Sequence, residues 1–179
     1  MMRKLLVTIC AVALLITGCG DSADINESSS TAQASPVAKN IPTFTAKTIT
    51  GETVTNEIFA SKKITIVNIW GTFCPPCIAE MPELGEMART LPADAQIIGF
   101  VCDASEESSQ IQKAIQITQE ANADFVNIIP DAQLLKFMEN VEAVPTTIFV
   151  NSKGEVVGRA VIGADIEGYK NELEKLLKE

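Results

Sequence analysis

The chain has 179 residues, of which 46% are hydrophobic and 21% are charged, and its formal net charge at pH 7 is −9. This acidic composition does not suit nucleic acid or an anionic lipid surface, so we expect no nucleic-acid partner. Five cysteines and no histidine are present, which means that no imidazolium can assist a reactive thiol.

Residues 1–18 have the pattern of an export signal. Two basic residues precede an apolar run at 5–17, which is too short to span a bilayer with margin and is typical of a signal-peptide core. Residues 15–19 (LITGC) are similar to a bacterial lipobox. We therefore expect lipidation of Cys19 and a lipid anchor on the extracytoplasmic face of the bacterial cytoplasmic membrane. The alternatives are an ordinary signal peptide or an uncleaved anchor, in which Cys19 is incidental.

Residues 19–40 are predicted to be a flexible tether. They are rich in Ser, Ala, Asp and Asn and show no apolar periodicity, so they cannot bury enough surface to fold. Residues 41–179 are long enough for one domain with a core, and no second linker interrupts them.

The first elements of this domain are a hairpin, a buried strand and a helix. Residues 44–54 alternate around a glycine-containing turn, which predicts a β-hairpin. Residues 63–70 are apolar and β-branched, as in a strand buried on both faces, and residues 78–90 are predicted to form a helix. Cys74 and Cys77 therefore fall at a strand-to-helix junction.

The spacing of Cys74 and Cys77 indicates a reversible disulfide. The reactive form of cysteine is the thiolate, and a helix N-terminus stabilises that anion with free N–H groups and the positive end of its dipole. Pro75 and Pro76 suit the first helical turn, where a missing N–H costs little. We expect Cys74 to attack a partner disulfide and Cys77 to resolve the mixed disulfide.

Two neighbours of the cysteine pair have open interpretations. Glu80 follows Cys77 by three residues, so its carboxyl group could exchange a proton with Cys77, or it could be a solvated acid in an early helical turn. Trp70 could pack beside the disulfide or simply fill the core.

The rest of the domain alternates strands and helices. In chain order we expect a strand at 96–102, a helix from Asp103 or Ser105 to about 122, a strand at 125–129, a helix from 130, a hairpin of 146–150 with 155–162, and a C-terminal amphipathic helix. This order predicts an α/β sandwich with a central mixed β-sheet flanked by helices.

Metal binding is the alternative chemistry for the cysteine pair. A zinc site of four cysteines lacks ligands, because only Cys102 remains once Cys19 is lipidated and the signal is removed. Two soft thiolates could hold copper(I), so a copper-binding assembly factor stays an alternative. We expect no cofactor.

Several segments resemble the thioredoxin-fold proteins, and among them the TlpA/ResA-type membrane-anchored thiol-disulfide oxidoreductases. The matching segments lie within residues 41–179 and are WGTFCPPC at 70–77, EMP at 80–82, VPTT at 144–147 and the hairpin with Lys153-Gly154. The resemblance implies the thioredoxin fold, with an N-terminal hairpin and an extra helix-strand insertion between Cys102 and Ile129.

The resemblance also implies roles and partners. Pro145 is expected to be a cis-proline facing the disulfide, Val144 to offer backbone hydrogen bonds to a partner peptide, and Glu80 to be the acidic residue beside the active site. The implied activity is reduction of disulfides in exported proteins such as apocytochrome c, with electrons from a CcdA-like membrane donor.

Other activities on this fold remain alternatives. An oxidase or isomerase uses the same residues, and the sequence does not give the direction of electron flow. A peroxidase needs one cysteine poised for peroxide, and a non-catalytic adhesion module needs neither cysteine. The chain departs from the family pattern at Phe73, where many relatives have a second tryptophan, and at Cys102, which we interpret as a small apolar core residue.

Overall fold

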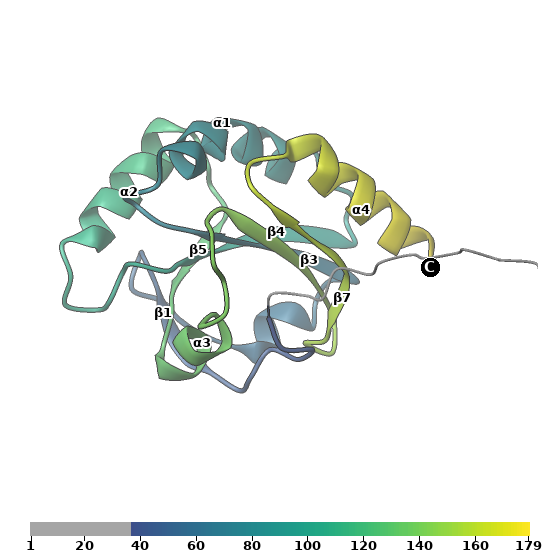
Figure 1. The fold of residues 1–179 in the computed structure, drawn as a ribbon, viewed down its shortest axis with the longest axis horizontal. Coiled ribbons are helices and arrows are strands. Elements are labelled where there is room, and N and C mark those ends of the chain that lie inside the picture. The colour runs from purple at the N-terminus through teal and green to yellow at the C-terminus, as the bar shows by residue number, and fades with distance from the viewer. Residues whose placement is uncertain (1–36) are drawn as a thin grey trace, which may run out of the picture. The chain divides into compact units, whose positions relative to one another are not determined.

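The computed structural model describes residues 37–179, which form a seven-stranded sheet with helices on both faces (Figure 1). In chain order the elements are β1 (Thr45–Thr48), β2 (Thr53–Thr55), the 3-10 helix η1 (Asn56–Phe59), β3 (Ile64–Trp70), α1 (Pro75–Thr90), β4 (Ala95–Val101), α2 (Gln110–Glu120), β5 (Val126–Ile129), α3 (Ala132–Phe137), β6 (Thr146–Asn151), β7 (Val156–Ile162) and α4 (Ile166–Lys178). The predicted signal, Cys19 and the tether to residue 36 lie outside the described residues. Within 37–179 no helix combines the length and hydrophobicity needed to cross a membrane.

The sheet is mixed, as the sequence predicted. Its strand order is β2-β1-β5-β4-β3-β6-β7. The central strand β3 is parallel to β4 and antiparallel to β6. The predicted N-terminal hairpin is β1 with β2, and the predicted insertion is α2 with β5, which pairs with β4 on one side and β1 on the other. The predicted fold class is confirmed.

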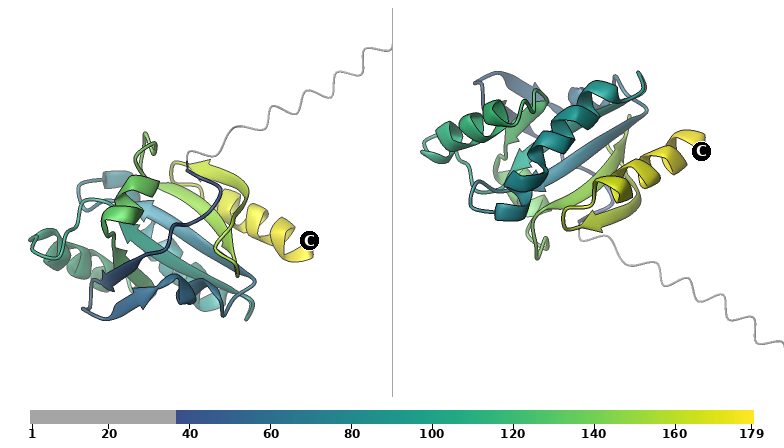
Figure 2. Two further views of the ribbon diagram at one scale, coloured as in Figure 1. Left: turned by 90° about the horizontal axis from the view of Figure 1, so that it is seen from below. Right: turned by 90° about the horizontal axis from the view of Figure 1, so that it is seen from above.

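The helices form two layers around the sheet. α1, α2 and α4 cover one face, and η1 and α3 lie on the other, as the views in Figure 2 show. All residues of β3 are buried. Ile66 and Trp70 pack on the α1 side, whereas Val67 and Ile69 pack on the α3 side. Because alternate side chains of a strand point to opposite faces, a strand covered on both faces is apolar throughout.

Helix α1 buries one stripe against the sheet. The buried positions include Cys77, Glu80, Met81 and Leu84, which recur at helical spacing. The helix begins at Pro75, so Pro75 and Pro76 occupy its first turn, as the sequence predicted, without loss of a hydrogen bond. A carboxyl group therefore sits in a stripe that is otherwise apolar or sulfur-containing.

The predicted start of the second helix is wrong. α2 begins at Gln110 rather than near Asp103 or Ser105. The carboxylate of Asp103 instead accepts hydrogen bonds from the backbone N–H and the hydroxyl of Thr72, at 2.9 and 2.6 Å. The hydroxyl of Ser108 bonds to the backbone of Ser105. These polar side chains thus stabilise loops instead of a helix N-terminus.

The predicted tether is wrong for its last four residues. Val37 is buried in the core on the α3 side. The carbonyl of Lys39 accepts a 2.7 Å hydrogen bond from the N–H of Val156, and Asn40 forms a β-bridge with Glu155. Packing of an apolar side chain and pairing with the β6–β7 hairpin therefore place residues 37–40 in the folded domain.

Candidate functional site

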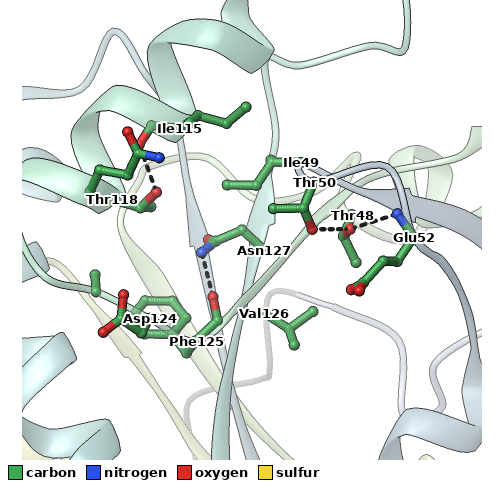
Figure 3. Close-up of a pocket in the computed structure, with 12 residues that line it drawn as sticks. Thr48, Ile49, Thr50, Glu52, Ile115, Thr118, Asp124, Phe125, Val126 and Asn127 are labelled. Carbon is green, nitrogen blue, oxygen red and sulfur yellow. Dashed lines mark hydrogen bonds between the residues drawn. The ribbon is translucent and has the colours of Figure 1, made fainter.

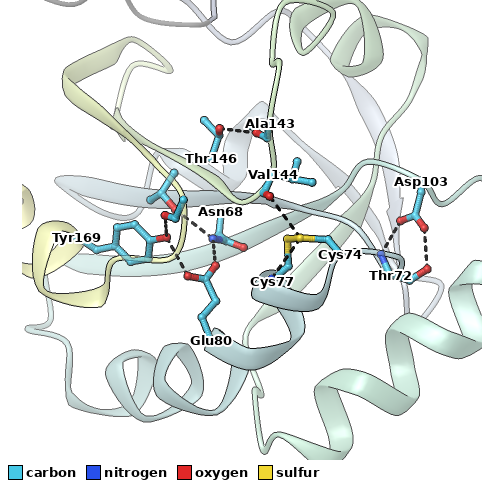
Figure 4. Close-up of a disulfide and its surroundings, with 12 residues drawn as sticks. Asn68, Thr72, Cys74, Cys77, Glu80, Asp103, Ala143, Val144, Thr146 and Tyr169 are labelled. Carbon is cyan, nitrogen blue, oxygen red and sulfur yellow. Dashed lines mark hydrogen bonds between the residues drawn. A yellow bond between two sulfur atoms is a disulfide. The ribbon is translucent and has the colours of Figure 1, made fainter.

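A disulfide joins Cys74 and Cys77 where β3 leads into α1, with the two Cα atoms 5.3 Å apart (Figure 4). Cys74 is 4% exposed, whereas Cys77 is completely buried. Only the sulfur of Cys74 is therefore near enough to the surface for a partner to attack or be attacked.

The start of α1 directs one backbone donor at Cys74. Cys74 is the N-cap of the helix, and Pro75 and Pro76 at the next two positions have no N–H. The first backbone N–H of the helix is that of Cys77, which donates to Sγ of Cys74 at 3.2 Å. A hydrogen bond to sulfur and the positive end of a helix dipole are features that stabilise a thiolate.

The loop before β6 lies against the disulfide. The Val144–Pro145 peptide bond is cis, as the resemblance implied. The carbonyl oxygen of Val144 lies 3.4 Å from Sγ of Cys74, and the carbonyl of Ala143 accepts a bond from the hydroxyl of Thr146. Residues 70 positions apart in the chain therefore meet at the reactive sulfur.

A groove of about 480 Å³ lies over Cys74. Its lining residues come from the cysteine junction, the end of β4 and the loop before β6, and they are Phe73, Cys74, Pro75, Pro76, Cys102, Val141, Glu142, Ala143 and Val144. The ring of Phe73 is 63% exposed beside this groove. An exposed aromatic ring next to a reactive sulfur is suited to contact with a polypeptide.

Glu80 is buried and hydrogen-bonded on the α1 side of the sheet. It is 3% exposed, which contradicts the interpretation as a solvated acid. Nδ2 of Asn68 donates to Oε1 and the hydroxyl of Tyr169 donates to Oε2, both at 2.9 Å (Figure 4). Burial raises the pKa of Glu80 to about 7, although the two hydrogen bonds lower it. Glu80 can therefore gain or lose a proton near neutral pH.

The Tyr169 hydroxyl accommodates both protonation states of Glu80. It lies 2.9 Å from Oε2 of Glu80 and 2.9 Å from the carbonyl oxygen of Gly163. Burial raises the pKa of Tyr169, so this hydroxyl keeps its proton. A single proton serves one acceptor at a time. Ionised Glu80 takes it, whereas protonated Glu80 can donate to Tyr169 while Tyr169 donates to Gly163.

Trp70 has a structural position. Its ring is fully buried in the same core cluster as the two cysteines, and Nε1 donates to Oδ1 of Asn127 at 2.9 Å. Trp70 therefore fills core, in the cluster that also contains Cys74 and Cys77.

Cys102 is a free thiol at the edge of the groove. It is partly buried, and its pKa is raised to about 11 by burial and by the neighbouring charge of Asp103. A thiol with a raised pKa is a poor nucleophile. Among residues 37–179 no group of three or more Cys, Asp or Glu side chains is arranged to hold a metal ion.

A separate hollow of about 350 Å³ lies between the β1–β2 turn and α2 (Figure 3). It is lined by polar and apolar residues that include Thr48, Thr118, Asp124 and Asn127, and none of its lining residues is a cysteine. The hydrogen bonds drawn there, such as Nδ2 of Asn127 to the carbonyl of Phe125, hold the strand and turn in place.

The sequence interpretation missed two residues of the site. Asn68 stands in the apolar run of β3, and Tyr169 stands among the buried residues of α4. An asparagine in a strand buried on both faces is the one signal that could have revealed the polar network, because buried polar groups need partners. Nothing in the sequence pairs Tyr169 with Glu80.

Comparison with known proteins shows the family to which the chain belongs. A model of the AhpC/TSA family matches residues 37–159, which is more than half of the chain. The chain belongs to the AhpC/TSA family. The curated relatives of the chain include proteins named for thiol-disulfide exchange.

The chain is 30% identical over 128 residues to sporulation thiol-disulfide oxidoreductase A of Bacillus subtilis. The match covers 70% of this chain and 74% of the relative. It is 25% identical over 135 residues to thiol-disulfide oxidoreductase ResA of Halalkalibacterium halodurans, covering 75% and 73% of the two chains. Across eight curated relatives the chain spans 63% to 77% of the relative's own length.

The fold is shared with solved structures. The exposed lipoprotein thioredoxin of Streptococcus pneumoniae is 18% identical, with a TM-score of 0.58, and the match covers 77% of this chain and 100% of that one. The resemblance to the thioredoxin fold and to ResA-type proteins is thus confirmed. This AhpC/TSA-family protein is a thiol-disulfide oxidoreductase.

Proposed function

We propose that the enzyme reduces disulfides of exported proteins through Cys74 and Cys77. The observation that carries the proposal is the pair at the start of α1, where a shallow Cys74 receives the first free N–H of the helix and Cys77 lies buried behind it. A shallow, activated thiol and a protected resolving thiol are what a two-step exchange requires.

The proposed reaction transfers two electrons. The Cys74 thiolate attacks one sulfur of the substrate disulfide, and the other substrate sulfur leaves as a thiolate that takes a proton from water. Cys77 then loses its proton and attacks Sγ of Cys74. The Cys74–Cys77 disulfide forms, the second substrate thiolate leaves, and the substrate is reduced by two electrons while the enzyme is oxidised.

Glu80 is the proposed acceptor of the Cys77 proton. It lies one helical turn after Cys77 on the buried face of α1, and its pKa of about 7 matches proton transfer at neutral pH. In the reverse direction, protonated Glu80 returns the proton when the internal disulfide is opened.

The groove over Cys74 is the proposed docking place of the substrate polypeptide. Phe73, Pro75 and Pro76 supply apolar lining from the cysteine junction, and Val144, which precedes cis-Pro145, supplies apolar lining from the loop before β6. Backbone groups of Val144 are proposed to pair with an extended segment that flanks the substrate cysteine. Trp70, which is buried in the same core cluster as the two cysteines, is proposed to support this surface from the interior of the domain.

The proposed location is the extracytoplasmic face of the cytoplasmic membrane. The signal at 1–18 and the lipobox ending at Cys19 support lipid anchoring, and residues 19–36 then serve as the tether. The substrates are disulfide-containing exported proteins such as apocytochrome c. A dithiol in an oxidising compartment needs a supply of electrons, which we assign to a CcdA-like membrane protein.

Trapping of mixed disulfides tests these roles. In the full chain, Cys77→Ser should accumulate covalent adducts between Cys74 and exported proteins, because the resolving step is lost. Cys74→Ser should form none, and Cys102→Ser should behave as the native protein. Non-reducing electrophoresis with mass spectrometry measures the adducts. Absence of adducts with Cys77→Ser under exchange conditions would contradict the proposal.

The reduction potential decides between a reductase and an oxidase on the same fold. We expect the Cys74–Cys77 couple to equilibrate near the thioredoxin value of about −270 mV, measured against glutathione or dithiothreitol buffers. A value near the DsbA level of about −120 mV would make the enzyme an oxidant instead. Cys102→Ser is the control that restricts the measurement to one couple.

A further inference from the structure

The polar network of Glu80 contains one atom without a partner. In residues 37–179, Oδ1 of Asn68 is the one buried side-chain oxygen or nitrogen that makes no hydrogen bond. Asn68 itself is fully buried. Its Nδ2 is used twice, donating to Oε1 of Glu80 at 2.9 Å and to Oγ1 of Thr147 at 3.1 Å. Buried polar atoms almost always have partners, so this exception needs an explanation.

The orientation of the Asn68 amide follows from Glu80. A carboxylate only accepts hydrogen bonds, so the NH₂ end of the amide must face it and Oδ1 must face the other way. In Figure 4 that other direction is toward the disulfide. Asn68 lies on the α1 side of β3 with Trp70, and Cys77 belongs to the core cluster on that side.

The two cysteines differ in the hydrogen-bond partners that surround each sulfur atom once the disulfide is reduced. A reduced Cys74 has an acceptor for its S–H in the carbonyl of Val144 and a donor for its thiolate in the N–H of Cys77. A reduced Cys77, fully buried, has no such partner among the hydrogen bonds of the oxidised protein. Oxidation leaves Cys77 without a proton to donate, and the same state leaves Oδ1 of Asn68 without a donor.

We propose that Asn68 is a positioning residue whose Oδ1 accepts the S–H hydrogen bond of Cys77 in the reduced enzyme. This bond holds the resolving sulfur against β3 and favours its protonated form, so that Cys74 alone is the thiolate before a substrate arrives. Glu80 acts on Cys77 partly through this amide, because its charge sets which end of the amide faces the sulfur. The titratable groups around Glu80 are Glu83 on α1 and Tyr169 on α4. The inference rests on the proposed resolving role of Cys77.

Infrared spectroscopy of the S–H stretch tests this hydrogen bond directly. In the reduced full chain, the difference between Cys74→Ser and Cys74→Ser/Cys77→Ser isolates the band of Cys77. We expect Asn68→Leu to shift this band to higher frequency, because the acceptor is lost. Asn68→Asp, which keeps an oxygen acceptor, should not shift the band to higher frequency. Thr147→Val, which removes only the neighbouring acceptor of Nδ2, should leave it at the native frequency. An unchanged band in folded Asn68→Leu overturns the proposal.

A second measurement needs no substitution at Asn68. With asparagine labelled by ¹³C at the side-chain carbonyl, the reduced-minus-oxidised infrared spectrum of the native chain should show one amide band moving to lower frequency as Oδ1 gains a donor. Cys77→Ser cannot form the Cys74–Cys77 disulfide, so its spectrum supplies the baseline. Absence of any asparagine signal on reduction overturns the proposal. Neither spectrum depends on exchange activity, so failure here is distinct from failure of the trapping experiment.

Discussion

Single residues at this site act through burial more than through their intrinsic chemistry. Glu80 would be an ordinary acid in water, yet at 3% exposure its pKa rises to about 7. The thiol of Cys102 is moved in the same direction, to about 11, which makes it less reactive. Cys74 instead gains a donor from the helix that it caps. Desolvation and one directed N–H thus separate a reactive thiol from an inert one.

Glu80 should make the stability of the oxidised protein depend on pH. Its pKa rises from 4.5 in the unfolded chain to about 7 in the folded protein. The folded state therefore keeps the proton between these values while the unfolded chain releases it, so stability from this group is full below pH 4.5 and is lost as pH rises through 7. At about 1.4 kcal/mol per pKa unit, the loss amounts to about 3 kcal/mol.

The variant Glu80→Gln isolates this contribution. The free energy of unfolding of the disulfide form, measured by urea titration at pH 5 and pH 8, should fall less for Glu80→Gln than for the native protein. Glu86→Gln, at an exposed position of the same helix, serves as the matched control. Equal pH dependence of the native protein and Glu80→Gln would show that Glu80 does not hold a proton preferentially in the folded state.

At the scale of elements, the site is the place where β3, α1 and the loop before β6 meet. β3 ends at Trp70, and the turn that follows is held by two bonds from Thr72 to Asp103 at the end of β4. β3 and β4 are parallel neighbours, so their carboxyl ends lie at the same edge of the sheet. The two hydrogen bonds between Thr72 and Asp103 therefore fix the turn that places Cys74 at the start of α1.

Removal of the Asp103 carboxylate should destabilise the turn between β3 and α1. Asp103→Ala leaves the N–H and hydroxyl of Thr72 unpaired at a position that is 2% exposed. Hydrogen bonds to charged groups contribute about 1.5 to 3 kcal/mol each, so we expect urea unfolding to show a loss of about 2 kcal/mol or more. Asp103→Asn keeps one acceptor oxygen and should lose less. A fully stable Asp103→Ala would mean that the turn is held by other contacts.

The whole molecule places its redox chemistry at one edge of a sheet that is covered on both faces. The layer of α1, α2 and α4 carries the disulfide and the Glu80 network, whereas the layer of η1 and α3 carries a second apolar core. The N-terminal segment belongs to that second core through Val37, so the domain begins before the boundary at Ile41 that composition indicated. Residues 37–40 join the fold because Val37 packs in this core and the backbone of Lys39 and Asn40 pairs with β7 and the turn before it.

The sequence by itself determined the alternation of strands and helices, the mixed sheet and the cysteine pair at a strand-to-helix junction. These features depend on local periodicity and spacing, which short segments of chain encode. The tertiary structure alone decided that Asp103 holds Thr72, that Tyr169 and Asn68 contact Glu80, and that Val144 lies beside Cys74. Those contacts join residues 12 to 89 positions apart, and burial and pKa follow from them, because desolvation depends on every element that packs around a group.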